Sequence, residues 1–232
     1  MLLDQHSDNS LLRLGGIAGI GAALFLPGVI LQTGLTSWFP EEALQQGDMT
    51  TWLEHVAANR ATAMTGVAFS IAAIISFMPF GLVLYKLLTG EGRWQPVAAL
   101  AFNILGVSLA LAAFTFAFGF TWALTDLAGA ANGQGAGGIS ALATMGMRGF
   151  LVCDDLATCL IGLSNGLYAY AGLRSKVLPR WLGWWGMIAG FLVTIVLLRY
   201  FFPIFAIAAV GYPLVVLWFA ATGILMLRKA AG

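Results

Sequence analysis

The chain has 232 residues, of which 60% are hydrophobic and only 9% are charged. A water-soluble domain carries roughly 25% charged residues, so the composition excludes an ordinary soluble fold and indicates a protein embedded in hydrocarbon. The formal net charge of +1 excludes a strong field that would attract nucleic acid. We therefore expect an all-α, polytopic transmembrane helical bundle that forms a single membrane domain and has membrane lipids as its partners.

Six segments are long and apolar enough to cross a bilayer, which takes about 20 residues of helix. Most connections between them are short, so neighbouring helices should run antiparallel. The start of the chain lacks the basic region and cleavage site of a signal peptide, so we expect the first apolar segment to remain in the mature protein. The expected spans are residues 12–38, 61–88, 96–124, 141–173, 181–199 and 203–227.

The longest connection, residues 39–60, is predicted to lie outside the membrane. Thr51 and Glu54 have the spacing of a capping box, which indicates the start of a helix. We expect a short helix at the membrane surface with Trp52 and Val56 on one face; a loop with a single helical turn is the alternative. The polar residues of this connection form either a solvated loop, which we prefer, or a divalent-cation site: Glu41, Glu42, Asp48, Glu54 and His55.

Lysine and arginine predict the orientation, because cytoplasmic loops carry an excess of both. With the N-terminus in the cytoplasm, eight of the 11 cations face that side, and only Arg60, Arg148 and Arg199 lie toward the other. The bias and the even number of spans together predict that both termini are cytoplasmic. The cytoplasmic cations are then Arg13, Lys86, Arg93, Arg174, Lys176, Arg180, Arg228 and Lys229.

Few polar residues lie inside the spans. Ionisable groups there cost roughly 2.5–3.5 kcal/mol each and are candidate functional residues by default. In a functional interpretation they form a proton or ion relay, or a polar substrate site. In a structural interpretation they form an ion pair, and Arg148 reaches the headgroups. The ionisable candidates are Arg148, Asp154, Asp155 and Arg199, and the neutral polar candidates are Asn103 and Asn165.

Depth within the spans suggests which of these residues pair. Asp155 and Arg199 both fall in the half of the membrane away from the cytoplasm, so we expect Arg199 to pair with Asp155 or with Asp154. Asn103 and Asn165 lie at similar depth, roughly 12 Å from the cytoplasmic edge. That depth predicts a hydrogen bond between the two amides.

Small residues recur with the four-residue spacing that lets transmembrane helices approach closely. These pairs indicate helix packing inside the molecule or between copies of it, and the spacing alone leaves both open: Gly15 with Gly19, Gly162 with Gly166, and Gly186 with Gly190. Tryptophans flank the spans and predict an interfacial aromatic belt; a pigment or quinone pocket is the less favoured interpretation. They are Trp38, Trp52, Trp94, Trp122, Trp181, Trp184 and Trp185.

Several cofactor and catalytic chemistries are not expected from the residues present. His6 and His55 both lie outside the spans, which argues against a bis-histidine haem or a histidine-ligated chlorophyll in the bilayer. The lysines lie at span ends, which argues against a buried retinal Schiff base. Ser164 has a serine-nucleophile-like setting but no intramembrane histidine to activate it. We therefore predict no cofactor of the protein's own.

The turn Arg174-Ser-Lys-Val-Leu-Pro-Arg-Trp-Leu-Gly183 and the preceding segment from Gly166 resemble a large family of bacterial six-span membrane proteins known only as a domain of unknown function. The connection from Asp48 to Leu88 is similar to the same family. The resemblance implies a bacterial inner-membrane location and no established activity. Family members often carry a histidine where Ser164 stands here.

Three functional hypotheses follow from these patterns. The favoured one is non-enzymatic: an accessory or structural subunit of a membrane assembly, or a protein that associates with itself as a homo-oligomer. The second is a small transporter or proton- or ion-coupled carrier that uses Asp154 and Asp155. The third is a membrane enzyme acting on lipid or quinone, which would need a lateral pocket ending in polar side chains.

Overall fold

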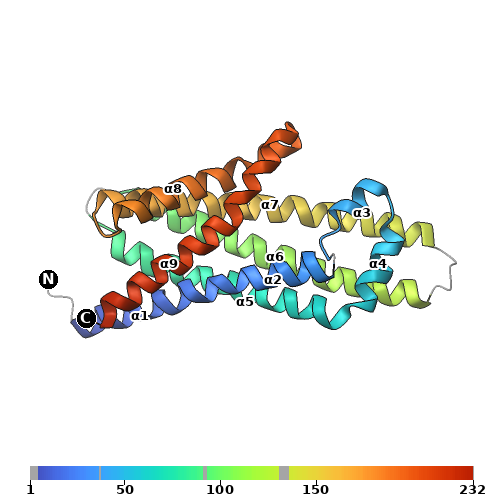
Figure 1. Ribbon diagram of the computed structural model, residues 1–232, viewed down its shortest axis with the longest axis horizontal. Coiled ribbons are helices and arrows are strands. Elements are labelled where there is room, and N and C mark those ends of the chain that lie inside the picture. The colour runs from blue at the N-terminus through green and yellow to red at the C-terminus, as the bar shows by residue number, and fades with distance from the viewer. Residues whose placement is uncertain (1–4, 37, 91–92, 131–135, 232) are drawn as a thin grey trace.

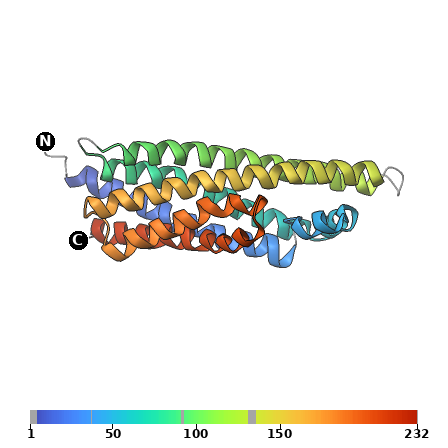
Figure 2. The same ribbon diagram turned by 90° about the horizontal axis from the view of Figure 1, so that it is seen from above.

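The computed structural model describes residues 5–36, 38–90, 93–130 and 136–231, and no strand occurs among them. Long helices lie side by side in an elongated bundle (Figures 1 and 2). Within the described residues six helical segments are long and apolar enough to cross a membrane, which confirms the predicted fold class. They are Asn9–Thr33, Arg60–Leu88, Gln95–Ala128, Gly137–Arg174, Arg180–Tyr200 and Pro203–Ala231. The expected bounds differ from these by at most five residues.

The first span is not one regular helix. Pro27 has no backbone N–H and its ring crowds the carbonyl four residues earlier, and the helix changes type next to it. The segment runs through α1 (Gln5–Gly21), the 3-10 turn η1 (Ala22–Leu24), α2 (Phe25–Val29) and the π-helical η2 (Ile30–Leu35).

The remaining helices follow in chain order with short connections. Pro79 lies inside the first long one without ending it. These helices are α3 (Glu41–Gln46), α4 (Met49–Ala58), α5 (Arg60–Leu88), α6 (Gln95–Ala130), α7 (Ala136–Arg174), α8 (Arg180–Ile195), the 3-10 helices η3 (Val196–Tyr200) and η4 (Pro203–Val210), and α9 (Gly211–Ala231).

The start of α1 and the end of α9 lie at the same end of the bundle, which we call the terminal end (Figure 1). At the opposite end α6 and α7 run on past the other helices (Figure 2). With 36 and 39 residues, they are about 54 and 58 Å long, whereas the hydrocarbon core of a bilayer is about 30 Å thick. Part of both helices must therefore stand outside the hydrocarbon.

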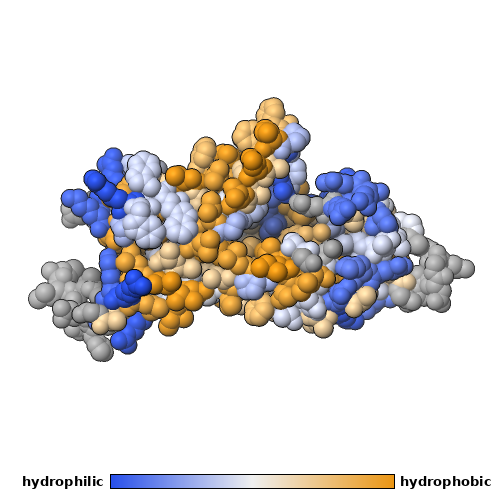
Figure 3. Space-filling model, viewed as in Figure 1, coloured by the Kyte–Doolittle hydropathy of each residue, from blue (hydrophilic) through white to orange (hydrophobic). Residues whose placement is uncertain are grey.

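This overhang, together with α3 and α4, forms a structure that we call the cap. Arg60 fixes the start of α5 to it: the guanidinium lies 3.2 Å from the ring centre of Trp122 and 3.5 Å from the Asp126 carboxylate, both on α6. In Figure 3 the apolar surface covers the middle of the molecule, and hydrophilic surface gathers at the cap and at the terminal end. This distribution is that of a helical bundle surrounded by lipid at its waist.

Helix α4 corrects the expectation for residues 39–60 in two respects. It begins at Met49, and Asp48 rather than Thr51 is its N-cap, because the Asp48 carboxylate accepts a hydrogen bond from the Thr51 backbone N–H. Its apolar face, which includes Trp52 and Val56, is buried and packs on α6 and α7. The apolar face of α4 therefore contacts other helices of the protein and is not presented to the membrane surface.

The seven tryptophans predicted for the belt differ in exposure, and Trp122 and Trp185 are half-buried. Trp94, Trp181 and Trp184 are exposed, as an interfacial belt requires. Trp38 and Trp52 are buried, so their assignment to the belt was wrong. Trp38 packs at 5.4 Å between ring centres against Phe150 and forms part of an aromatic cluster where the cap meets the bundle.

Candidate functional site

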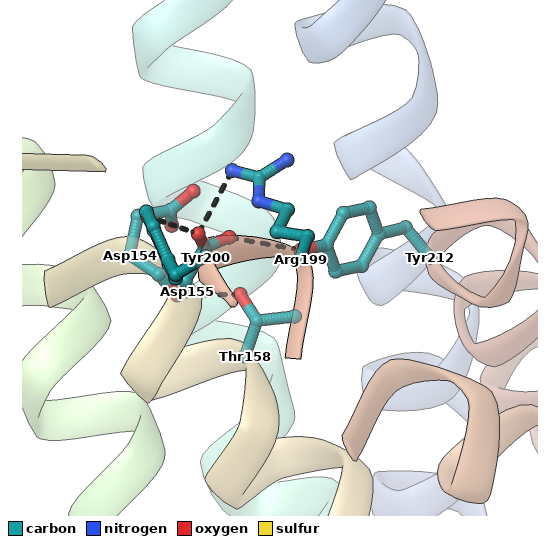
Figure 4. A network of polar contacts seen from close by, with 6 residues as sticks. All are labelled: Asp154, Asp155, Thr158, Arg199, Tyr200 and Tyr212. Carbon is teal, nitrogen blue, oxygen red and sulfur yellow. Dashed lines mark hydrogen bonds and ion pairs between the residues drawn. The ribbon is translucent and has the colours of Figure 1, made fainter. Parts of the chain in front are cut away.

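The polar centre of the bundle is Asp155, on α7. One carboxylate oxygen accepts hydrogen bonds from Arg199 Nη2 at 2.8 Å and from the Tyr200 hydroxyl at 2.5 Å. The other accepts one from the Tyr212 hydroxyl at 3.1 Å. Figure 4 shows these groups converging on the carboxylate from η3 and α9. The expected Asp155–Arg199 pair is thus present.

Local structure explains how two consecutive residues reach the same carboxylate. After Ile195 the chain tightens from α8 into the 3-10 helix η3, and Arg199 and Tyr200 are its last two residues. The side chain of Asp155 is only 4% exposed and that of Arg199 21%. A buried charge needs an opposite charge and hydrogen bonds to offset its loss of water, and Asp155 has both.

Asp154 has a different environment. The Thr158 hydroxyl donates to the Asp154 backbone carbonyl at 2.7 Å. The side chains of Asp154, Thr158 and Tyr212 contribute polar groups to a small, otherwise apolar cavity of about 40 Å³ between the helices. That volume has room for a few water molecules and is far below the 300–1,000 Å³ typical of ligand pockets.

A larger opening lies beside the ion pair, between α3, α7 and the η3–η4 hairpin. We call it the cap groove; its volume is about 680 Å³. Arg148 is exposed here, about two helical turns beyond Asp155 along α7, so of the predicted candidates on α7 Asp155 belongs to the ion pair and Arg148 to the groove. The lining residues are Leu44, Gln45, Arg148, Leu151, Val152, Arg199, Tyr200, Pro203 and Ala206.

The hydrogen bond expected between Asn103 and Asn165 is absent. Asn165 Nδ2 donates to the Gly186 carbonyl on α8 at 2.8 Å, whereas Asn103 faces Gly81 on α5. The Oδ1 atoms of both amides are buried without a hydrogen-bond partner among the described residues. The prediction rested on similar depth, but the two side chains point toward different helices.

The glycine pairs lie at contacts inside the molecule. A Cβ on Gly190 would come within 2.6 Å of the Gly162 carbonyl oxygen and 2.7 Å of Gly166 N, so α7 and α8 cross backbone to backbone. A Cβ on Gly19 would come within 2.6 Å of the Phe219 carbonyl oxygen on α9. Gly15 and Gly186 instead lie against side chains, those of Val83 and Trp218. Five of the six glycines therefore face close intramolecular contacts, whereas a Cβ on Gly166 would meet no atom within 4 Å.

Sequence reasoning missed the two tyrosines of the network, which lie in apolar segments and were not singled out. It also missed Ser164 as a packing residue: its buried hydroxyl donates to the Ala99 carbonyl at 2.8 Å, which joins α7 to α6. Among the described residues no three histidine, cysteine, aspartate or glutamate side chains come together to hold a metal ion. Cys153 and Cys159 are free thiols.

Six apolar helices around a buried ion pair define a multi-pass helical membrane protein. Residues 14–227 match the family described as Domain of unknown function (DUF4386), so the chain belongs to that family, as the turn after Arg174 indicated. No curated protein and no solved structure matches the chain.

Proposed function

We propose that the protein is a non-enzymatic membrane protein that binds the phosphate headgroup of an anionic lipid in the cap groove. The observation that carries the proposal is the pair of arginines, Arg148 and Arg199, that borders this open groove of about 680 Å³. Guanidinium groups bind phosphate through charge-assisted, often bidentate hydrogen bonds. The apolar lining residues offer a surface for the acyl chains.

The position of the groove supports a headgroup as its ligand. Arg148 is 26 residues before Arg174, the last residue of α7 (174 − 148 = 26), or about 39 Å along the helix axis. With Arg174 at one headgroup layer, Arg148 reaches the opposite one, because a bilayer with its headgroups is about 40–45 Å thick. The Asp155 network holds Arg199 at the edge of the same groove.

The geometry supports binding better than chemistry or transport. Among the described residues that line the groove there is no histidine, cysteine or carboxylate that could serve as a base or nucleophile. A carrier would need a water path to Asp154 or Asp155, but Asp155 is paired and buried, and the cavity beside Asp154 measures only about 40 Å³. A quinone ring would not enter that cavity without displacing its walls.

An accessory role in a larger membrane assembly is compatible with lipid binding, and the cap favours it because this part of the molecule stands clear of the hydrocarbon. Self-association through the glycine pairs is not favoured, since those faces are used between α7 and α8 and between α1 and α9. Native mass spectrometry after gentle extraction would show a second polypeptide if the accessory role is right.

Lipid binding at the cap groove can be tested with Arg148→Gln. Arg148 is exposed, so the variant should fold normally. With about 1 kcal/mol per interfacial cation, binding of phosphatidylglycerol to delipidated protein in detergent should weaken about fivefold. Arg13→Gln, an exposed cation on α1 near the terminal end, is the matched control and should bind like the wild type. Equal affinity in both variants would refute the proposal.

A further inference from the structure

We propose a second binding site, for an anionic phospholipid of the other leaflet, in a groove at the terminal end that we call the turn groove. It lies where α7 passes through the turn at residues 175–179 into α8, and its volume is about 610 Å³. It is separate from the cap groove, so the inference does not rest on the function proposed above. The lining residues are Leu173, Lys176, Leu178, Arg180 and Trp184.

The charged residues that the structure describes in the lining of the turn groove are both cations. Lys176 and Arg180 are exposed and border it, and the described part of the chain contributes no carboxylate to its lining. Lys229, from the end of α9, adds a further cation at the same turn, where its Nζ donates to the Val177 carbonyl at 3.1 Å. Cations gathered on a concave surface in the headgroup layer attract an anionic phosphate group.

The backbone at Lys176 supports a role for its side chain. Lys176 has a φ of +58°, a left-handed conformation that costs a non-glycine residue roughly 1–2 kcal/mol. The conformation closes the end of α7: Lys176 N donates to the Leu173 carbonyl at 3.3 Å, and Leu178 N donates to the Gly172 carbonyl at 3.2 Å. Glycine would make the same turn without strain, yet a lysine stands here and borders the groove.

The surface next to the groove selects a lipid over a free phosphate ion. Trp184 lines the groove, and Ile188 and Phe191 follow it at four and seven positions along α8, which places them on one helical face. These side chains are 57%, 56% and 64% exposed. They form an apolar stripe that leads from the cations toward the middle of the bilayer. A molecule with an anionic head and acyl chains fits both parts of the surface.

Lysine acylation can test this site within the unmodified protein. The chain has three lysines, Lys86, Lys176 and Lys229, so each can be followed separately by peptide mass spectrometry after a brief reaction with an acylating ester. Short-chain phosphatidylglycerol, added to the protein in detergent, should slow the acylation of Lys176 about fivefold or more. Lys86, exposed at the end of α5 away from this groove, is the internal control and should react at its original rate.

Two further additions separate the possible sources of protection. Inorganic phosphate and short-chain phosphatidylcholine, each at the same concentration, should leave the rate at Lys176 within about twofold of the lipid-free value. Equal protection by inorganic phosphate would overturn the lipid assignment. Equal protection of Lys86, or equal protection by phosphatidylcholine, would show a general micelle effect and would also overturn it.

Arg180→Gln provides the matched variant, because it removes the second cation while Lys176 remains available as the reporter. We expect protection by phosphatidylglycerol to require about fivefold more lipid in this variant. Arg13→Gln, which removes a cation outside the groove, should not change the lipid requirement. An unchanged requirement in Arg180→Gln, with wild-type thermal stability, would contradict the site.

Discussion

Asp155 accepts hydrogen bonds from Arg199, Tyr200 and Tyr212 in the interior of the bundle. Asp155→Asn keeps the shape of the side chain but removes the charge that offsets Arg199 at 2.8 Å. Breaking a buried pair leaves the remaining charge uncompensated, at a typical cost of 3–5 kcal/mol. Because Arg199 keeps some contact with solvent, we expect a loss of about 2 kcal/mol, measured as a lower thermal midpoint in a fixed detergent.

A control for this prediction is Asp126→Asn. The Asp126–Arg60 pair is longer, at 3.5 Å, and its side chains are 65% and 47% exposed, so its loss should cost less than about 1 kcal/mol. In the double variant Asp155→Asn/Arg199→Gln the losses should be less than additive, by about 1–3 kcal/mol. Strict additivity would show that Asp155 and Arg199 are not energetically coupled.

Single residues also show how far the sequence can predict this site. Opposite charges at matching depth were enough to predict the Asp155–Arg199 pair, because an unpaired charge in hydrocarbon is so costly. Tyr200 and Tyr212 could not be recognised, since tyrosine is common at membrane boundaries without any partner. The predicted hydrogen bond between Asn103 and Asn165 was wrong because depth does not specify which neighbouring helix a side chain faces.

At the level of the helices, the N-cap of α4 can be tested by mutation. Asp48→Ala removes the carboxylate that accepts the Thr51 N–H at 3.1 Å, and loss of an N-cap costs about 0.5–2 kcal/mol. Hydrogen exchange of peptides covering the first turn of α4 should therefore become several-fold faster. Thr51→Ala, which removes the side chain suggested by the capping-box spacing, should leave exchange unchanged. The reverse result would restore Thr51 as the cap.

The crossing of α7 and α8 is a second test at this level. Gly190→Ala puts a methyl group against the Gly162 carbonyl oxygen at 2.6 Å, where backbone faces backbone and neither helix can yield locally. We expect a loss of about 1–3 kcal/mol in thermal unfolding. Gly149→Ala, on α7 and with no atom within 4 Å of the new Cβ, should be neutral or slightly stabilising. Similar destabilisation by both would refute a close crossing.

Sequence patterns alone do not predict where a helix is capped or which helix it crosses. The spacing of Gly162 and Gly166 predicts a close approach but is the same whether the partner is α8 or another molecule. Likewise two residues near the start of α4 could act as caps, and only the backbone conformation at Asp48 decides between them. For the crossing, the reason is that the partner helix is not specified by any local pattern in the sequence.

For the whole molecule, the orientation in the membrane is the prediction to check. We expect the termini and the turn groove in the cytoplasm and the cap on the opposite side, following the positive-inside rule. In a Cys153→Ser/Cys159→Ala background, Gln46→Cys on α3 should react with an impermeant maleimide added to intact cells. Thr89→Cys, at the terminal end of α5, should react only after the membrane is permeabilised. The opposite pattern would invert the topology.

The number of spans could be predicted because a run of about 20 apolar residues is rarely anything other than a transmembrane helix. The overhang of α6 and α7 could not, since Phe116, Leu142 and Met145 continue the apolar pattern past the length of a bilayer. Hydropathy records what a residue is and not how far it lies from the midplane. The cap became evident only from the unequal lengths of neighbouring helices.

Those unequal lengths make the protein sensitive to hydrophobic mismatch. The span Arg180–Tyr200 has only 21 residues, about 30–35 Å of helix, so it sets the thickness that the surrounding acyl chains must match. Longer acyl chains would bring hydrocarbon up to Arg148 and Arg199, at a cost of fractions of a kcal/mol for each ångström. The protein should therefore partition into the thinner regions of a heterogeneous membrane.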